Sequence, residues 1–317
     1  MSSSAASSPS PVRALLELLR LPNVFTALAD VAMGFLFTHP TAQPAAQLAL
    51  LAVASGSLYL AGMVLNDYFD REIDLAERPE RPIPSGRISA RFAQNLGWAL
   101  LGIGVLAGWS AGLATGSART GAVATLLALA VFAYDFKLKH TPLGPLAMGS
   151  CRTLNVLLGM SAGAEPFQAV HAVVALGIGA YIAGVTWFAR TEATESRRGQ
   201  LAFALLVMLS GIGLLASYPQ WATDRLAPFS RPVYAANAGD RWYWFWGLMA
   251  VMIGWRALRA IIDPMPVYVQ SAVKQCLISL IVLDAAVCMG VRGPFYAMAV
   301  VALVLPTMFL GRWIYST

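Results

Sequence analysis

The sequence predicts an all-α fold, a polytopic transmembrane bundle of nine to ten spans around a central cavity. Composition is the first reason for this prediction, because 58% of the 317 residues are hydrophobic and only 12% are charged, whereas soluble domains carry about 25% charged residues. The second reason is that the apolar residues gather into stretches of ~20, the length at which a helix crosses a bilayer. Both observations argue against a soluble globular protein.

Residues 1–12 precede the first apolar stretch and are rich in Ser, Ala and Pro. They lack the basic segment and short apolar core of a cleaved signal peptide, so we expect a disordered cytoplasmic tail. Residues 13–317 then form a single transmembrane domain. Its stretch at 242–262 carries two arginines and many aromatic residues, so part of it could lie at the membrane interface. The candidate spans are 21–38, 46–66, 93–113, 119–135, 143–163, 168–189, 200–217, 242–262, 267–290 and 294–312.

Lys and Arg cluster in alternate loops, at 67–92, 136–142 and 190–199. Because cytoplasmic loops carry the excess of these residues, the pattern places these loops and the N-terminus in the cytoplasm and loop 218–241 outside. We therefore expect a multi-pass protein, in a bacterial inner membrane. The same rule accounts for the net charge of +6, so we expect membrane lipid and no nucleic acid as a partner.

The strongest chemical signal is the run Asn66-Asp67-Tyr68-Phe69-Asp70-Arg71-Glu72-Ile73-Asp74. Its aspartates are three and four residues apart, a spacing that puts Asp67, Asp70 and Asp74 on one stripe of a helix. Like charges on one stripe repel, and a divalent cation would remove the conflict. Mg²⁺ prefers oxygen ligands and often sits between carboxylates and substrate phosphates. The stripe therefore predicts a Mg²⁺–diphosphate site; the alternative is a solvated helix end neutralised by Arg71 and Arg78.

The segment after this run, Glu77-Arg78-Pro79-Glu80-Arg81-Pro82-Ile83-Pro84-Ser85-Gly86, is a loop, because its prolines and glycine interrupt a helix. Arg78 and Arg81 are candidates to grip phosphate, since guanidinium groups pair well with phosphate oxygens. Topogenic positive charge is the compatible, simpler interpretation.

Several ionisable or polar residues fall inside the candidate spans: Asp30, Arg152, Asn155, Lys274 and Asp284. A charge at the centre of a membrane helix costs roughly 2.5–3.5 kcal/mol, so such residues usually face the interior and pair. We expect Asp30 and Arg152 to form one buried pair. Arg152, Asn155 and Gly159 share a helical face and are expected to line one wall of the cavity. The alternative for Arg152 is a purely structural role.

The aspartate run and the following RPxRPIPSGxIS segment together resemble the UbiA superfamily of intramembrane prenyltransferases. The opening Arg20-Leu21-Pro22-Asn23-Val24 also looks like that family, and Tyr134-Asp135-Phe136-Lys137-Leu138-Lys139 occupies the place of its tyrosine-then-basic element. The segments GPLAMGSCRTLNVLLGMS and FARTEATESRRGQ resemble the EboC-like, prenyltransferase-related branch.

This resemblance implies transfer of a prenyl group from a polyprenyl diphosphate to an acceptor, often an aromatic ring, with Mg²⁺ as cofactor. On that basis Asp67, Asp70 and Asp74 would hold the metal, and Asn66 would orient an aspartate or a phosphate. The residues expected to contact substrate are Asn23, Arg78, Arg81, Tyr134, Lys137, Lys139, Arg152 and Asn155.

One segment departs from the family pattern. A second Asp-rich stripe is usual after the sixth span, but this chain has Glu192 and Glu195 there, flanked by arginines. The two glutamates are candidates for substrate and metal binding; the alternative is a solvated turn that the arginines neutralise. The altered stripe keeps a rival open, in which the chain binds or moves a prenyl lipid or related metabolite without catalysis.

Overall fold

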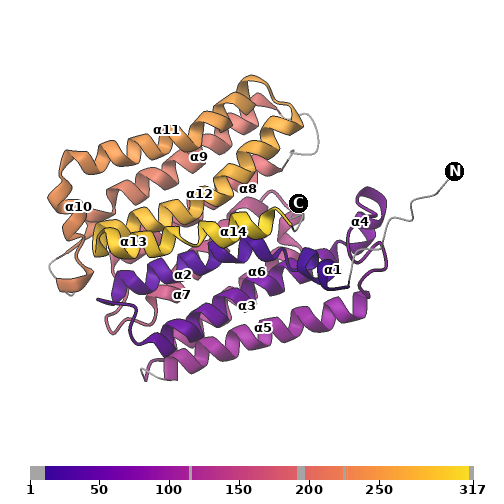
Figure 1. Cartoon of the computed structure of the whole chain (residues 1–317), viewed down its shortest axis with the longest axis horizontal. Helices are drawn as coiled ribbons and strands as arrows, with labels where there is room; N and C mark the ends of the chain where they lie inside the picture. Colours follow the sequence, from indigo (N-terminus) through magenta and orange to yellow (C-terminus); the bar gives the residue numbers. More distant parts are fainter. Residues whose placement is uncertain (1–10, 114–115, 191–196, 224–225, 227, 314–317) are drawn as a thin grey trace.

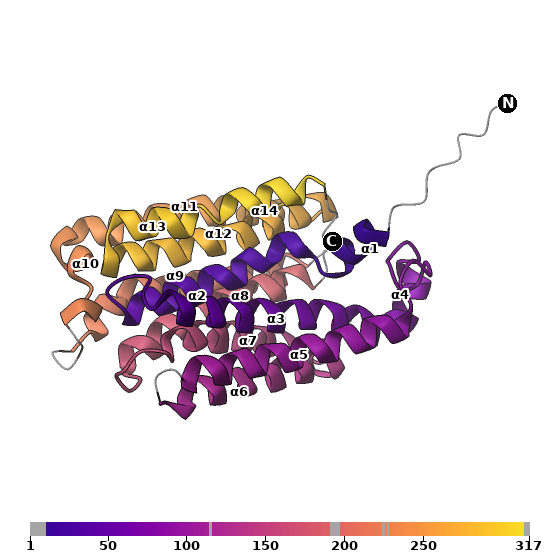
Figure 2. The same ribbon diagram turned by 60° about the horizontal axis from the view of Figure 1, so that its bottom comes forward.

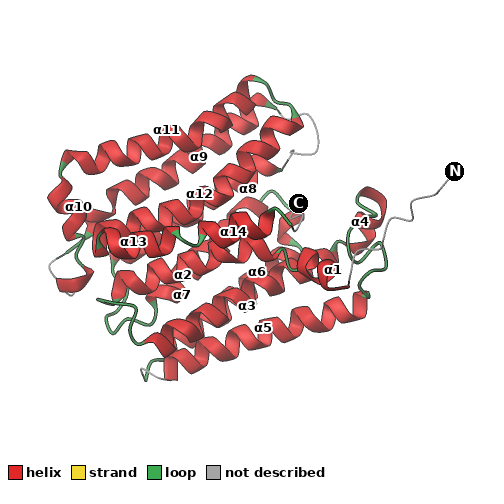
Figure 3. Ribbon diagram, in the orientation of Figure 1, coloured by secondary structure: helices red, strands yellow, loops and turns green. Residues whose placement is uncertain are grey.

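The computed structural model describes residues 11–113, 116–190, 197–223, 226 and 228–313. Within these residues the regular secondary structure is helical throughout (Figure 3). The short helix α1 (Pro11–Leu18) and the 3₁₀ turn η1 (Leu21–Asn23) lead into the bundle. The bundle contains α2 (Val24–Thr38), α3 (Ala45–Phe69), α5 (Ala90–Leu113), α6 (Ala118–Phe136), α7 (Gly144–Met160), α8 (Ala169–Ala189), α9 (Arg198–Ser217), α11 (Asp240–Ile262) and α12 (Pro266–Arg292). Two short helices, α13 (Pro294–Val301) and α14 (Val304–Gly311), end the described chain.

Nine helical segments of the described chain are long and apolar enough to cross a membrane. The protein is therefore an integral, multi-pass membrane protein, as the sequence predicts. The stretch at 242–262 lies within α11, whose 23 residues make it one of the nine candidate spans. The segment expected at 143–163 is α7, which has only 17 residues and so rises about 26 Å at 1.5 Å per residue. It lies inside the bundle, against α2, α6 and α8.

The helices form two groups that share α2 and α7. One buried apolar cluster joins α2 and α7 to α8, α9, α11 and α12, and a second joins them to α3, α5 and α6. Figure 1 shows α2 and α7 between the two groups, and Figure 2 shows α2 between α12 and α3. The two shared helices approach closely at Gly34 and Gly159, since a Cβ added at Gly159 would lie 2.4 Å from the Val31 carbonyl oxygen. Small residues permit such backbone contact in membranes.

One end of the bundle carries α1, α4 (Arg71–Glu77) and the last residues of α14 (Figure 1). There α1 packs through Ala14 and Leu18 onto Val64 of α3 and onto Ile83 and Ile88 of the loop that follows α4. This packing holds the proline-rich loop against the end of α3. The loop is thereby fixed beside the aspartate run.

Candidate functional site

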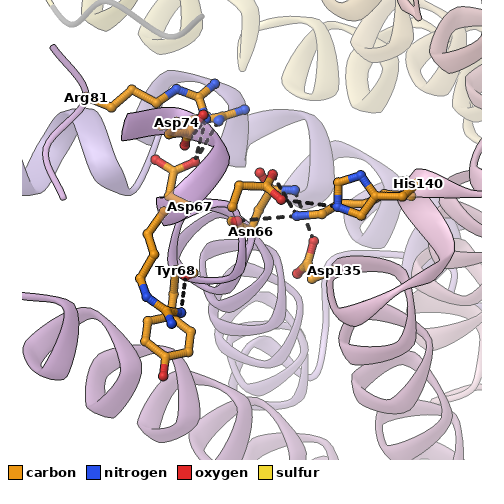
Figure 4. A network of polar contacts seen from close by, with 11 residues as sticks. Asn66, Asp67, Tyr68, Asp74, Arg81, Asp135 and His140 are labelled. Atoms are coloured by element: carbon orange, nitrogen blue, oxygen red, sulfur yellow. Dashed lines mark hydrogen bonds and ion pairs between the residues drawn. The ribbon is translucent and has the colours of Figure 1, made fainter. Parts of the chain in front are cut away.

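The aspartate run does not form one continuous helical stripe. Helix α3 ends at Phe69, Asp70 lies between the helices, and α4 begins at Arg71. The break turns the three carboxylates in two directions, so the expectation that they share one face is wrong. Asp67 and Asp74 lie together beside Arg81 (Figure 4), whereas Asp70 pairs with Lys139.

Arg81 lies between the carboxylates of Asp67 and Asp74 and contacts both. Its Nη1 lies 2.7 Å from Asp74 Oδ2 and 3.4 Å from Asp67 Oδ1, and Arg20 Nη2 lies 2.9 Å from the same Asp67 oxygen. Both aspartate side chains are buried. Buried charges need partners. Arg81, on the proline-rich loop, is such a partner for both aspartates. Arg78 is half-buried at the end of α4, and the contacts to the two aspartates come from Arg81 and Arg20.

Asp70 faces the turn η2 (Leu138–His140). Lys139 Nζ lies 2.8 Å from Asp70 Oδ2 and also donates to the Asn66 carbonyl oxygen at 3.3 Å. His140 Nε2 lies 3.3 Å from Asp70 Oδ1. The turn after α6 therefore brings a third cation, Lys139, to the site beside Arg20 and Arg81. Lys137 is exposed, and the structure does not bring it into these contacts.

Asn66 connects this group to a further carboxylate. Its Nδ2 donates to Asp135 Oδ1 at 3.3 Å. The aspartate that Asn66 contacts is therefore one from α6 and lies outside its own run. Asp135 is buried, and Figure 4 shows it beneath Asn66, on the side toward His140. We did not single out Asp135 from the sequence, although it lies inside the quoted Tyr134–Lys139 element.

A central cavity begins beside Asp135. It has an empty volume of about 480 Å³ and is lined by α2, α3, α6 and α7. Most of its wall is apolar, and its polar residues include Tyr134 and Asp135 near one end and Arg152 and Asn155 deeper in the bundle. Gly159, expected on the same wall, instead contacts the backbone of α2. Its helical spacing puts Gly159 on the same face of α7 as Asn155, as expected, but at Gly159 this face packs against α2.

The deep polar residues form an interior network. Arg152 Nη1 donates to Asp30 Oδ2 at 3.0 Å, and Asn155 Nδ2 donates to the same oxygen at 3.0 Å. The predicted pair of Asp30 and Arg152 is therefore confirmed. Arg152 also donates to Thr26 Oγ1 at 2.8 Å and lies 5.2 Å from the centre of the Tyr59 ring. Ser55 of α3 donates to Asn155 Oδ1 at 2.7 Å, which ties a third helix to the pair.

One predicted residue lies elsewhere, and two lie outside the described part of the chain. Asn23 is in η1, where its carbonyl accepts a hydrogen bond from Thr26 Oγ1 at 2.8 Å, away from the aspartate run. Glu192 and Glu195 are outside the described residues. Sequence reasoning missed Arg20, although it stands in the quoted RLPNV segment. The signal available in the sequence was the position of this cation, directly before the turn that leads into the bundle.

Comparison with known proteins gives a family, close relatives of part of the chain, and a fold. The model of the UbiA prenyltransferase family matches residues 27–262. A digeranylgeranylglyceryl phosphate synthase from Ignicoccus hospitalis is 40% identical over 157 residues, 49% of this chain and 48% of that protein. The corresponding synthase from Methanopyrus kandleri is 36% identical over 165 residues, 50% of this chain and 56% of that protein. The chain thus spans about half the length of the curated relatives it matches.

A solved structure of a UbiA homolog from Archaeoglobus fulgidus bound to GPP and Mg²⁺ has the same fold. Its TM-score is 0.55 at 14% identity, and the match covers 91% of this chain and 99% of that one. At this identity the likeness concerns the fold alone. This likeness confirms the predicted fold, an all-helical bundle around a central cavity.

Proposed function

Because the chain belongs to the UbiA prenyltransferase family, we propose that it transfers a prenyl group from a polyprenyl diphosphate to an acceptor, with Mg²⁺ bound at the aspartate run. The observation that carries the proposal is the position of that run. Asp67, Asp70 and Asp74 are interleaved with Arg20, Arg81 and Lys139, and Asn66 links them to Asp135 at the edge of an apolar cavity. Carboxylates for a cation and guanidinium groups for phosphate are thus next to a space for an apolar chain.

The donor set fits Mg²⁺. Asp70 Oδ1 and Asp135 Oδ2 are buried without a hydrogen-bond partner in the described chain; His140 is near the first of them, at 3.3 Å, but not in hydrogen-bond geometry. The described residues contain no group of three or more His, Cys, Asp or Glu side chains that could hold a metal by themselves. This suits Mg²⁺, which usually takes one or two carboxylates together with substrate phosphates. When bound, Mg²⁺ would neutralise the diphosphate and stabilise the leaving pyrophosphate.

The protein's own residues would act around that ion. Arg20, Arg81 and Lys139 already neutralise carboxylates, and each is of a type that binds phosphate oxygens. The apolar wall of the cavity would keep water from the allylic cation that develops as the C–O bond breaks. Tyr134, on that wall, presents an aromatic ring, which attracts positive charge on its face.

The proposal extends to the acceptor and the location. The Ignicoccus and Methanopyrus relatives are named for a glyceryl phosphate product, so the acceptor we propose is a phosphate-bearing lipid.

The location we propose is a bacterial inner membrane, with the N-terminus in the cytoplasm. The basic loops at the end of the bundle that carries α1 and α4 support this orientation. A cysteine placed in loop 78–90 should then react only with reagents that reach the cytoplasm, and one at 225–240 only with external reagents. The reverse labelling would overturn the orientation.

The metal site is tested by binding. Asp67→Asn and Asp70→Asn should each abolish the binding of a labelled prenyl diphosphate that depends on Mg²⁺, because each removes a carboxylate charge without changing the side-chain size. The control is Asp263→Asn, at an exposed aspartate that follows α11. The measurement is equilibrium binding to purified protein with Mg²⁺ or with a chelator. Unchanged binding in both site variants would sink the assignment.

A second candidate function is the binding or movement of a prenyl lipid without catalysis. It is favoured by the sequence at Glu192 and Glu195, where the family's second Asp-rich stripe is altered. If both acidic segments serve catalysis, Glu192→Gln with Glu195→Gln should lower prenyl transfer at least ~100-fold, which corresponds to about 2.7 kcal/mol, with little loss of thermal stability. If the unmodified protein transfers no prenyl group with any chain length and a broad acceptor pool, the non-catalytic function is the better one.

A further inference from the structure

The carboxylate of Glu17, on α1, contacts the proline-rich loop that carries Arg81. Its Oε2 lies 2.6 Å from Arg87 Nη1, and the two side chains are only 14% and 22% exposed. Glu17 Oε1 also lies 3.1 Å from Nε of Arg13, whose side chain is 57% exposed. Exposed charges are screened by water and salt more than partly buried ones. Of these two ion pairs, the one to Arg87 is therefore the stronger, and it joins α1 to the loop.

Arg87 connects this ion pair to two further points of the loop. Its Nη2 donates to the Glu80 carbonyl oxygen at 2.7 Å, and its Nε donates to Ser85 Oγ at 3.1 Å. A guanidinium group is planar and presents its donors in a rigid fork. Because Arg87 binds α1 and two positions of the loop at once, it fixes the loop relative to α1.

Ser85 connects Arg87 to the backbone of Arg81. The Ser85 hydroxyl accepts from Arg87 and donates to the Arg81 carbonyl oxygen at 2.6 Å. The backbone N–H of Ser85 donates to the same carbonyl oxygen at 3.0 Å. These bonds close a turn between Arg81 and Ser85. The backbone of Arg81 is therefore held by a residue that Arg87 contacts, and Arg87 is held by Glu17.

The position of the Arg81 backbone matters because its guanidinium contacts two carboxylates. Nη1 lies 2.7 Å from Asp74 Oδ2 and 3.4 Å from Asp67 Oδ1. The second distance is already at the upper end for a hydrogen bond, so a small shift of the loop would break that contact. The arrangement of Arg81 between the two aspartates thus depends on contacts that begin at Glu17.

The end of α1 brings a second cation to Asp67. Arg20 Nη2 lies 2.9 Å from Asp67 Oδ1. In the described chain, Arg20 is the one residue other than glycine with a positive φ, at φ 44° and ψ 46°. This left-handed conformation is unfavourable for a residue with a Cβ and persists where surrounding contacts hold it. The Arg20 N–H donates to the Glu17 carbonyl oxygen at 3.0 Å, so the backbone of Glu17 also supports the turn that places Arg20.

We propose that Glu17 is a positioning residue for Arg81 at the diphosphate site. Its carboxylate holds Arg87, and Arg87 in turn holds the loop through Ser85. The helix that precedes the bundle thereby sets the place of a phosphate-binding cation without touching the ligand itself. The inference rests on the proposed function in one respect, namely that the ligand of the site is a prenyl diphosphate. The hold of Glu17 on the loop does not depend on it.

The first test is the binding of a labelled prenyl diphosphate to the purified full chain in the presence of Mg²⁺. Glu17→Gln removes the charge and keeps the side-chain size, and should weaken binding ~3- to 5-fold, the effect expected of a partly exposed ion pair. The matched control is Glu77→Gln, at an exposed glutamate that ends α4, which should leave binding unchanged. Equal weakening in the control, or unchanged binding in Glu17→Gln, would overturn the proposal.

A double-mutant cycle separates positioning from a general structural role. If Glu17 acts through Arg81, adding Glu17→Gln to Arg81→Gln should weaken binding no further, whereas the effects of independent sites multiply. Multiplied effects would overturn the proposal. Arg87→Lys keeps a positive charge beside Glu17 but lacks the fork that reaches Glu80 and Ser85. It should weaken binding at least as much as Glu17→Gln, and binding like that of the parent would overturn the connection through Ser85 on which the proposal depends.

Amide hydrogen exchange in the ligand-free protein distinguishes this inference from the proposed function. The amides of Ser85, Gly86 and Ile88 donate to carbonyls of the same loop. They should exchange faster in Glu17→Gln than in the parent or in Glu77→Gln, because a loop that loses a contact opens more often. Unchanged exchange would overturn the inference and leave the proposed function standing. Faster exchange in a protein that binds no prenyl diphosphate would support the hold of Glu17 on the loop and overturn the proposed function.

Discussion

The aspartate-run site and the interior network solve the same problem of buried charge in different ways. The aspartate run pairs several carboxylates with cations from nearby loops, such as Arg81, only 14 residues from Asp67. The interior network instead joins Asp30 to Arg152, 122 residues away, and uses neutral donors such as Asn155 for the rest. Charges at the end of the bundle can exchange partners with a ligand, whereas Asp30 and Arg152 in the middle pair with each other.

This difference indicates that the aspartate-run site is the region able to react and that the interior network keeps the helices in place. Arg81 shares two carboxylates and sits on a loop, so its contacts can change without moving a helix. Arg152 is held by Asp30, Thr26 and the Tyr59 ring at once. A change there would disturb α2, α3 and α7 together. Stability measurements should therefore separate the two regions.

The largest loss of stability is expected for Arg152→Met. It would leave Asp30 as an uncompensated charge with 0% exposure, and breaking a buried pair in this way costs about 3–5 kcal/mol. Unfolding in detergent, followed by circular dichroism, would measure the change. Adding Asp30→Asn to the same chain removes the orphaned charge and should restore much of the stability. A single variant as stable as the parent would contradict a structural role for the pair.

The next largest effect is expected for Gly159→Ala, which tests the close approach of α2 and α7 that the network needs. The new Cβ would lie 2.4 Å from the Val31 carbonyl oxygen, and overpacking of this kind costs about 1–3 kcal/mol. Gly213→Ala is the control, because nothing lies within 4 Å of a Cβ there, and alanine favours a helix over glycine by about 1 kcal/mol. Equal melting temperatures for the two variants would argue against the contact.

A loss of stability smaller than that of Arg152→Met, about 1.5–3 kcal/mol, is expected for Arg81→Gln, since hydrogen bonds to charged groups contribute on this scale and Arg20 remains beside Asp67. Binding should respond more strongly, with prenyl diphosphate affinity lowered at least ~10-fold. Comparing unfolding and binding in one preparation measures both. A variant that unfolds as readily as Arg152→Met but still binds would reverse the distinction between the two regions.

The smallest effect is expected for Asp284→Asn, within about 1 kcal/mol of the parent. The Asp284 carboxyl on α12 faces that of Asp30, and neither of its oxygens has a hydrogen-bond donor in the described chain. A carboxylate there would be a buried, unpaired charge, so we expect the neutral acid, which donates to Asp30 as an amide would. Infrared spectroscopy should show a protonated carboxyl band that Asp284→Asn removes. Its absence from the parent protein would contradict the neutral acid.

The sequence predicted most of the fold because membrane spans are local features. Length and hydropathy identify a helix without reference to its neighbours, and only α7, which is short and lies within the bundle, departed from a full span. The aspartate run was recognisable for the same reason. Its actual geometry was not, because the break at Asp70 and the packing of the Arg81 loop against α1 and α3 are tertiary features that no spacing rule contains.

The interior network shows the limit of prediction more clearly. The cost of a charge inside a membrane predicted that Asp30 needs a partner, and Arg152 was the obvious candidate. Nothing local indicated that Asp284 lies against Asp30, that Arg20 reaches Asp67, or that Asp135 joins Asn66. Each of these contacts depends on how helices far apart in the chain are arranged, which a pattern read along one segment does not contain.

The position of α2 has a consequence for synthesis of the protein. This helix leaves the ribosome well before its partners: Asp30 is paired by a residue made 122 positions later, and the carbonyls of Leu36 and Phe37 accept from Arg292, about 256 positions later. At 5–20 residues per second, the first delay lasts roughly 6–24 s and the second roughly 13–51 s. During that time the nascent helix holds an acid without its native partner, at a cost of roughly 2.5–3.5 kcal/mol if the charge lies at the centre of the span.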